Sequence, residues 1–154
     1  MAKRESAGIL PYRWQQQELQ FFLVHHGGPF WAGKEVGAWG ICKGELAEGE
    51  GPLQAAIREF KEETGHEIKG PFMELTPVVQ KGGKKVYAWA TEQEIDADSI
   101  QCNTFTMQWP PHSGQWQSFP EVDKADWFHV AEAKEKINAA QVLFIEEAVN
   151  RLME

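Results

Sequence analysis

Short apolar runs, rich in β-branched and aromatic residues, alternate with polar turns along most of the chain, a pattern typical of strands. Such runs occupy residues 7–10, 19–26, 38–42, 74–80, 84–91, 105–109 and 127–130. A polar turn at 15–18 separates the first two, and Gly82-Gly83 favours a hairpin between two later ones. The stretch 110–120 is rich in Pro, Ser, Gly and Gln and therefore predicts a surface loop.

Two segments predict helices instead. Pro52 suits the first turn of a helix and Gly65 suits the left-handed residue just past its end, so a helix is predicted over 52–64. A second helix is predicted to open with Asn138 as N-cap and Gln141 three residues later. Its apolar stripe consists of Val142, Ile145, Val149 and Leu152. Helices among short strands indicate an α/β fold in which helices pack a mixed sheet.

The composition is typical of a globular protein. The 154 residues, 42% hydrophobic and 25% charged, fit a single domain over 1–154. The longest apolar run, 86–90, is far shorter than the ~18 residues of a membrane-spanning helix. The N-terminus lacks the apolar segment of a secretory signal, so we expect a cytoplasmic protein. Cys42 and Cys102 lack metal-binding spacing and are expected as reduced thiols, with one disulfide as the alternative.

The negative charge is concentrated in one window. The formal net charge is −8, and residues 44–68 hold seven acids against two bases. The acids are Glu45, Glu48, Glu50, Glu59, Glu62, Glu63 and Glu67, and the bases are Arg58 and Lys61. This balance argues against duplex nucleic acid as a partner, because phosphate neutralisation needs clustered Lys and Arg.

Three of these acids share one face of the predicted helix. Glu59, Glu62 and Glu63 fall within an arc of about 100°, at the edge of its apolar stripe. Their charges repel one another and, near a helix C-terminus, oppose the macrodipole. A hard divalent cation such as Mg²⁺ would compensate, since it binds carboxylates together with water and phosphate oxygens. The alternative is a solvated acidic face without a ligand.

The spacing around this helix favours the metal site. Read from Gly44, the chain is Gly44-(five residues)-Glu50-(seven residues)-Arg58-Glu59-Phe60-Lys61-Glu62-Glu63-Thr64-Gly65. It resembles the Nudix box, G-x(5)-E-x(7)-R-E-U-x-E-E-x-G-U with U a bulky apolar residue, and fills every fixed Gly, Glu and Arg position. Two positions depart from it: Phe60 is larger than the usual aliphatic residue, and His66 replaces the final apolar one. Residues 28–45 also resemble a bacterial subgroup of predicted nucleoside triphosphate pyrophosphohydrolases, except that Cys42 stands where Pro is expected.

The resemblance implies a Nudix-type α/β/α sandwich that hydrolyses the pyrophosphate linkage of a nucleoside diphosphate joined to another moiety. By the motif match, Glu59, Glu62 and Glu63 are ligands of Mg²⁺, with Mn²⁺ as a substitute. The Lys43 backbone carbonyl is a further ligand in the turn before the motif. Cations are needed because cleavage between two anionic phosphates develops charge on oxygen.

The same match assigns supporting roles to other motif residues. Gly44 lets the backbone approach closely, and Gly65 ends the helix. Arg58 pairs with Glu50 and holds the loop against the helix, in a bidentate geometry that lysine would not reproduce. Arg58 thereby orients the catalytic carboxylates.

An additional acid from a late loop often serves this family as metal ligand or general base. Glu121 is the candidate, because its placement ahead of Trp127 resembles that of the Glu before an aromatic-containing strand in dinucleoside-tetraphosphate hydrolases. The neighbouring Asp123 and Asp126 are alternatives, as is an ordinary polar role for all three.

The expected partner is a small-molecule nucleotide, either a nucleoside triphosphate or a dinucleoside polyphosphate, and neither a membrane nor duplex nucleic acid. The expected assembly is a monomer or a homodimer. A catalytically inactive Nudix-fold binding or sensing module is the alternative function. Such modules typically lose glutamates of the box, whereas all of them are present here.

Several aromatic side chains are candidates for contact with a base. Trp31, Trp39, Trp109 and Trp116 lie in or beside predicted loops. A base can stack on such residues, although a single tryptophan is more often structural. His25 and His26 end a predicted strand, and a surface position is expected for them, with substrate contact as the alternative.

Overall fold

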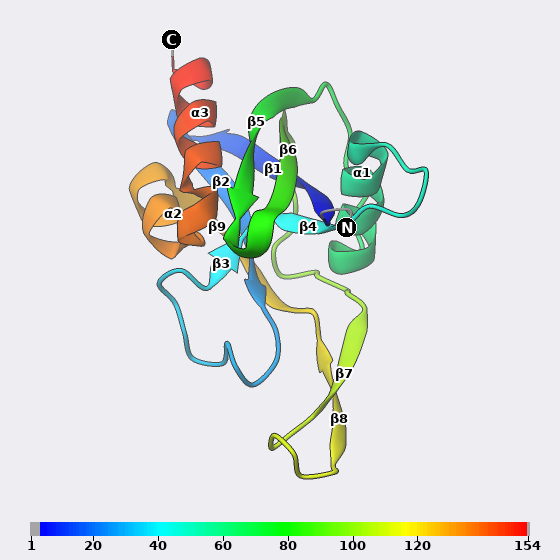
Figure 1. The fold of residues 1–154 in the computed structure, drawn as a ribbon. Helices are drawn as coiled ribbons and strands as arrows, with labels where there is room; N and C mark the ends of the chain where they lie inside the picture. The colour runs from blue at the N-terminus through cyan, green and yellow to red at the C-terminus, as the bar shows by residue number, and fades with distance from the viewer. Residues whose placement is uncertain (1–3, 154) are drawn as a thin grey trace.

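The computed structural model describes residues 4–153 as helices packed on both faces of one sheet (Figure 1). The strands are β1 (Glu5–Gln15), β2 (Glu18–His26), β3 (Trp39–Gly40), β4 (Cys42–Glu45), β5 (Met73–Gln80), β6 (Lys84–Glu92), β7 (Thr104–Gln108), β8 (Trp116–Pro120) and β9 (Val122–His129). The helices are α1 (Pro52–Thr64), α2 (Val130–Lys136) and α3 (Val142–Leu152), with 3-10 turns at Lys81–Gly83 and Ala139–Gln141.

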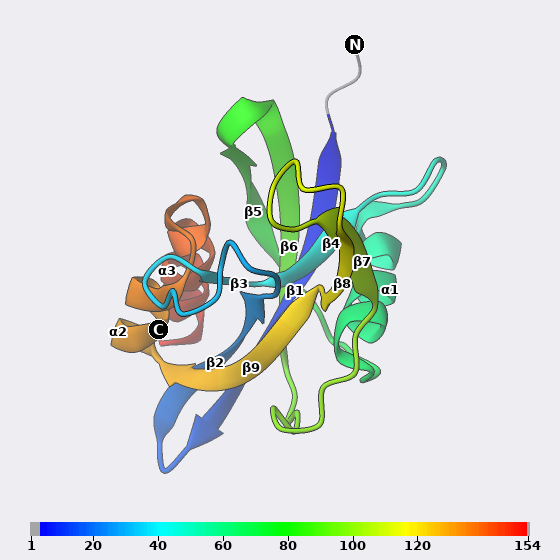
Figure 2. The same ribbon diagram turned by 90° about the horizontal axis from the view of Figure 1, so that it is seen from below.

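Seven of the strands form one mixed sheet. Its order is β3-β2-β1-β6-β5, with β4 paired to β1 and β9 paired to β2. Strands β1 and β6 run parallel, and the other pairs in the sheet are antiparallel. Helix α1 covers one face, and α2 and α3 cover the other (Figure 2). This architecture confirms the predicted α/β/α sandwich.

The central strands are buried on both faces, so successive side chains enter two different apolar layers. In β2, Phe21 belongs to the layer under α2 and α3, and Phe22 belongs to the layer under α1. Helix α1 contributes Phe60 to its layer, and α3 contributes Phe144 to the other. Burial on both faces explains the unbroken apolar run at 21–24.

Helix α1 has the predicted bounds. Pro52 occupies its first turn, and Gly65 follows its last residue in the left-handed conformation with a φ of 79°. The Gly65 N–H donates to the Lys61 carbonyl at 2.8 Å, which satisfies one of the last carbonyls of the helix. None of the helices in residues 4–153 is long and apolar enough to cross a membrane.

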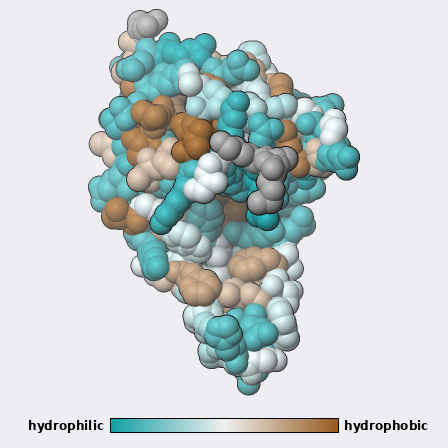
Figure 3. Space-filling model, viewed as in Figure 1, coloured by the Kyte–Doolittle hydropathy of each residue, from teal (hydrophilic) through white to brown (hydrophobic). Residues whose placement is uncertain are grey.

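The predicted surface loop at 110–120 is wrong over its second half. Residues Trp116–Pro120 form β8, which pairs with β7 as a two-stranded hairpin outside the main sheet. Nearly all residues of β8 are exposed, so the strand has no apolar alternation and is defined only by its pairing. The hairpin projects from the body of the molecule (Figure 1 and Figure 3).

Three other strands differ from their predicted bounds. Strand β1 spans Glu5–Gln15 rather than 7–10, because it pairs with β6 and β2 along most of its length. The run 38–42 is divided at Ile41 into β3, which pairs with β2, and β4, which pairs with β1. Strand β9 begins at Val122 because its residues pair with β2 along most of its length. Val130, predicted as the end of that strand, instead begins α2, a short helix that the sequence pattern did not predict.

The C-terminal helix begins later than predicted. Asn138 caps the 3-10 turn instead, because its Oδ1 accepts the Ala140 N–H at 2.9 Å. Gln141 is buried, and its Oε1 accepts the Ile41 N–H at 2.9 Å. Its side chain therefore does not form the predicted capping box with Asn138. The most buried residues of α3 are Phe144, Ile145 and Ala148, while Val142, Val149 and Leu152 are partly buried around them.

Candidate active site

Strand β4 and helix α1 meet at a position that only glycine can occupy without displacement. Gly44 lies directly against the side chain of Glu59, and a Cβ atom at Gly44 would overlap the Glu59 carboxylate. The backbone at Gly44 therefore approaches the side chain of Glu59 closely. This approach brings the backbone of β4 next to the carboxylates of α1.

Arg58 ties the loop before α1 to the helix. Its Nε and Nη2 donate to the two carboxylate oxygens of Glu50 at 2.8 and 2.9 Å, so the predicted bidentate pair is present. Its Nη1 donates to Glu59 at 2.8 Å and to Glu62 at 3.1 Å. The hydrogen bonds from Arg58, with a further one from the Ala47 N–H, lower the pKa of Glu50 to about 2.

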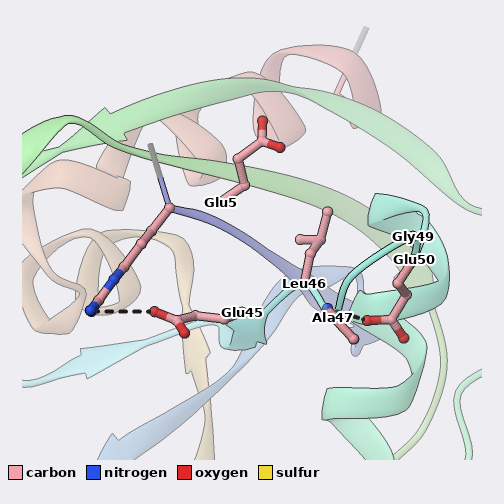
Figure 4. Close-up of a pocket in the computed structure, with 7 residues that line it drawn as sticks. Glu5, Glu45, Leu46, Ala47, Gly49 and Glu50 are labelled. Atoms are coloured by element: carbon pink, nitrogen blue, oxygen red, sulfur yellow. Dashed lines mark hydrogen bonds and ion pairs between the residues drawn. The ribbon is translucent and has the colours of Figure 1, made fainter. Parts of the chain in front are cut away.

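The opposite side of this loop borders a depression of about 400 Å³ (Figure 4). Arg4 lies 3.7 Å from the Glu45 carboxylate there, and the Glu50 Oε1 accepts the Ala47 N–H at 2.9 Å. The Glu50 carboxylate therefore binds both Arg58 of α1 and the Ala47 N–H of its own loop. These hydrogen bonds fasten the loop before α1 to the helix.

We expect Arg58→Lys to lower the free energy of unfolding by about 1–2 kcal/mol, because an ammonium group cannot reproduce the forked hydrogen bonds to Glu50. Urea denaturation would measure the change. The matched control is Lys61→Arg in the same helix, where the exposed pair with Glu67 at 3.3 Å contributes little. Equal stability of Arg58→Lys and the wild type would contradict the importance of the bidentate pair.

Carboxylates from two distant segments share one cavity of about 480 Å³ beside β4. Glu59 and Glu63 reach it from α1, and Glu121 reaches it from the connection between β8 and β9. The other lining residues are His26, Gly27, Trp31, Gly44, Glu45 and Phe105. The cavity therefore joins an acidic side to an aromatic one.

Burial, and after it like charge, perturbs the carboxylates in this cavity. Burial raises the pKa of Glu63 to about 7, and the charges of Glu59 and Glu121 act in the same direction. The Cys42 thiol opposes this shift by donating to the Glu63 carboxylate at 2.9 Å. Burial also raises the pKa of Glu59, against the effect of Arg58. A cation in the cavity would relieve this repulsion.

Two other predicted ligands lie beside the cavity. Glu62 is 40% exposed and is engaged by Arg58 one turn earlier in the helix. Lys43 directly precedes Gly44 in β4, where it is paired with Gly8 of β1. Helical periodicity thus placed three glutamates on one arc, and two of them face the cavity.

The structure separates the three candidate late acids. The backbone of Glu121 is held on both sides, since its N–H donates to the Asn103 carbonyl and its carbonyl accepts the Gly27 N–H, each at 3.0 Å. Asp123 instead lies 2.7 Å from His25, and Asp126 lines a different depression. Of the three acids, Glu121 lines the cavity with Glu59 and Glu63.

Of the two histidines, His25 does not have the expected surface position. His25 is only 1% exposed, and its ring nitrogens lie 2.7 Å from Asp123 and 2.6 Å from the Lys34 carbonyl. The prediction was wrong for His25 because the fold brings Asp123 of β9 and the Lys34 carbonyl of the β2–β3 loop against its ring. His26 lines the cavity, and burial together with the charge of Lys43 lowers its pKa.

The four candidate tryptophans have different environments. Trp31 lines the cavity, whereas Trp39 is a core residue with 3% exposure. Trp109 packs on Phe30, and Trp116 lies exposed on β8. Phe105 also lines the cavity and was not predicted to do so, although the alternation of Phe105 and Met107 with polar residues gives β7 one apolar face.

The donor chemistry of the cavity fits a hard divalent cation. Glu59, Glu63 and Glu121 offer carboxylate oxygens, which Mg²⁺ prefers, and they line one cavity together. Within residues 4–153, no three His, Cys, Asp or Glu side chains already form a metal-binding group. Arg58 and Cys42 engage some of these oxygens, so Glu59 and Glu63 would have to turn away from them to hold an ion.

Comparison with known proteins identifies the architecture. A family model described as NUDIX domain matches residues 2–148. The NUDIX domain of Shewanella oneidensis NrtR, complexed with ADP ribose, is 17% identical and has a TM-score of 0.70 over 99% of this chain and 90% of that one. A binary complex of Caenorhabditis elegans Ap4A hydrolase is 22% identical, with a TM-score of 0.64 over 96% of this chain and 98% of that one. At these identities, the structures establish a shared fold.

A curated relative matches a smaller part of the chain. An octanoyltransferase from Myxococcus xanthus is 30% identical over 101 residues, which are 66% of this chain and 25% of that protein. Because the chain spans only a quarter of that protein's length, the match carries no acyl-transfer activity over to it.

Proposed function

Since the chain belongs to the NUDIX domain family and is a Nudix hydrolase, we propose that it uses Mg²⁺ to cleave the pyrophosphate linkage of a nucleoside diphosphate joined to another moiety. A nucleoside triphosphate or a dinucleoside polyphosphate is the favoured substrate. The observation that carries the proposal is the meeting of Glu59, Glu63 and Glu121 in one cavity beside Gly44. ADP ribose and Ap4A, named with two structural neighbours, also contain linked phosphates, which supports this substrate class.

In this proposal, Glu59, Glu62 and Glu63 hold the cation together with the Lys43 backbone carbonyl. When bound, the cation would neutralise the negative charge that develops on the phosphate oxygens. Arg58 keeps its bidentate pair with Glu50 and so holds the loop against the helix. The late acid, Glu121, takes a proton from the attacking water or completes the ligand set.

The direct test is a substrate panel of nucleoside triphosphates, dinucleoside polyphosphates and nucleotide sugars, incubated with the protein and Mg²⁺. Chromatography of the products shows which bond is cut. We expect cleavage within the phosphate chain, with products that each retain at least one phosphate. Tight nucleotide binding without cleavage of any compound would contradict the proposal and favour a binding module.

We expect millimolar Mg²⁺ or Mn²⁺ to raise the melting temperature of the protein, because the cation relieves repulsion among Glu59, Glu63 and Glu121. At about 100 times its dissociation constant, a cation that binds only the folded state adds about 2.7 kcal/mol to its stability. Thermal denaturation with and without metal measures the shift. The control is Glu67→Gln, an exposed acid outside the cavity, which should keep the full shift. An unchanged melting temperature in the wild type would count against the metal site.

A further inference from the structure

The cavity that contains Glu59, Glu63 and Glu121 also has an aromatic side. Trp31, from the loop between β2 and β3, and Phe105, from β7, line it. We infer that these two side chains bind the base of the substrate while its phosphate chain extends to the carboxylates. The inference rests on the proposed function and adds to it the residues that recognise a nucleobase.

The β7–β8 hairpin presents an apolar face on this side. Phe105 and Met107 alternate in β7 with the exposed Thr104 and Thr106, so the two pairs lie on opposite faces of the strand. Phe119 of β8 is the cross-strand partner of Phe105, and their ring centres are 5.9 Å apart. The apolar face of the hairpin therefore continues the side of the cavity that Phe105 lines.

The same face contacts the β2–β3 loop at two places. Phe105 lies against Gly28, where an added Cβ atom would be only 2.8 Å from the ring. The rings of Phe30 and Trp109 meet edge to face with their centres 5.2 Å apart. Because Trp31 follows Phe30 directly, these contacts hold it on the same side of the cavity as Phe105.

Trp31 is supported by its neighbours without being covered. Its ring packs against His26 with centres 5.1 Å apart, and the Lys34 ammonium lies 5.6 Å from the ring centre. The residue remains 36% exposed, whereas the core residue Trp39 is 3% exposed. An orienting contact together with an accessible ring is the arrangement that a stacking ligand needs.

A nucleobase fits this aromatic side better than a sugar or a phosphate does. A flat base can stack on an aromatic ring whatever its identity, and this stacking corresponds to about 5- to 150-fold in affinity. The base is uncharged and is not repelled by the carboxylates of the cavity, whereas a phosphate is. A bare sugar has no π system with which to stack on these rings.

Binding measurements test the inference without requiring turnover. Calorimetric titration with Mg²⁺ compares AMP, GMP, CMP and UMP with ribose 5-phosphate, which lacks a base. We expect the wild type to bind the best nucleotide about 5- to 150-fold more tightly than ribose 5-phosphate. Trp31→Ala and Phe105→Leu should each lose most of this difference, and Trp31→Phe should keep much of it because the phenyl ring still stacks.

The matched control is Trp116→Ala in the same hairpin. Trp116 is 65% exposed and, by strand alternation from Phe119, lies on the opposite face, so its loss should leave the difference unchanged. Phe105→Leu retains an apolar contact with Gly28, and its melting curve verifies that the hairpin stays in place. Equal affinity of the wild type for ribose 5-phosphate and all nucleotides would overturn the inference. So would an unchanged difference in both Trp31→Ala and Phe105→Leu. Failure to hydrolyse any nucleotide would instead contradict the proposed function, and the binding result would still decide this inference.

Discussion

Glu63→Gln is expected to lower kcat by about a hundredfold or more while the protein remains folded. The amide keeps the size of the side chain and can still accept the Cys42 S–H, which lies 2.9 Å from the carboxylate. It cannot supply the negative charge that holds a cation against substrate phosphates. A bound metal stabilises the transition state by several kcal/mol, and each 1.36 kcal/mol corresponds to a factor of ten in rate. Steady-state kinetics on the best substrate of the panel, at saturating Mg²⁺, measures the loss.

Two further variants show whether this loss depends on the cavity. Glu62→Gln should also lose activity if the cation draws Glu62 away from Arg58. Glu67→Gln, 70% exposed and outside the cavity, should retain full activity. Near wild-type turnover in both Glu62→Gln and Glu63→Gln would show that the motif does not support catalysis in this chain.

The metal-free stability of Glu63→Gln should differ from the wild type in a defined pH range. Burial raises the pKa of Glu63 to about 7, above the usual value of 4.5. An acid with a raised pKa in the folded state destabilises that state as it ionises, so the wild type loses stability between about pH 4.5 and pH 7. The amide does not titrate, and Glu63→Gln should therefore melt higher than the wild type at pH 8 in the presence of a chelator. A lower melting temperature there would contradict the unfavourable burial of the charge.

The features that the sequence predicted well depend on local interactions. Helix α1 was located to the residue because Pro52 and Gly65 act on the backbone at their own positions. Helical periodicity alone predicts that Glu59 and Glu63, four residues apart, lie next to each other on one face of α1. The ion pair between Arg58 and Glu50 joins residues only eight positions apart, and this separation is the one that the sequence motif specifies.

The features that the sequence did not predict depend on contacts between distant segments. Strand β8 has no apolar pattern of its own and exists through its pairing with β7. The burial of His25 depends on Asp123, which is separated from it by 98 positions. Likewise, Glu121 enters the cavity because its backbone is bonded to Gly27 and Asn103, which no periodicity connects. The acidic half of the site was therefore visible in the sequence, whereas its junction with the aromatic side required the fold.

Glu121→Gln is expected to lower kcat by about a hundredfold or more, in line with the loss of a general base, with little change in melting temperature. The Glu121 backbone, not its side chain, makes the hydrogen bonds to Asn103 and Gly27 that hold this connection. Removal of the carboxylate charge therefore alters the cavity without loosening the fold. Kinetics and thermal denaturation of the same preparation separate the two effects.

The neighbouring acids provide the controls for this assignment, because their surroundings predict different losses. Asp126 lines another depression, so Asp126→Asn should leave kcat unchanged. Asp123→Asn weakens the contact with the buried His25 at 2.7 Å, so it should lower the melting temperature more than it lowers kcat. If Glu121 is the base, the pH dependence of kcat should lose its acidic limb in Glu121→Gln and keep it in Asp126→Asn. A fully active Glu121→Gln together with an inactive Asp123→Asn or Asp126→Asn would move the role to that neighbour.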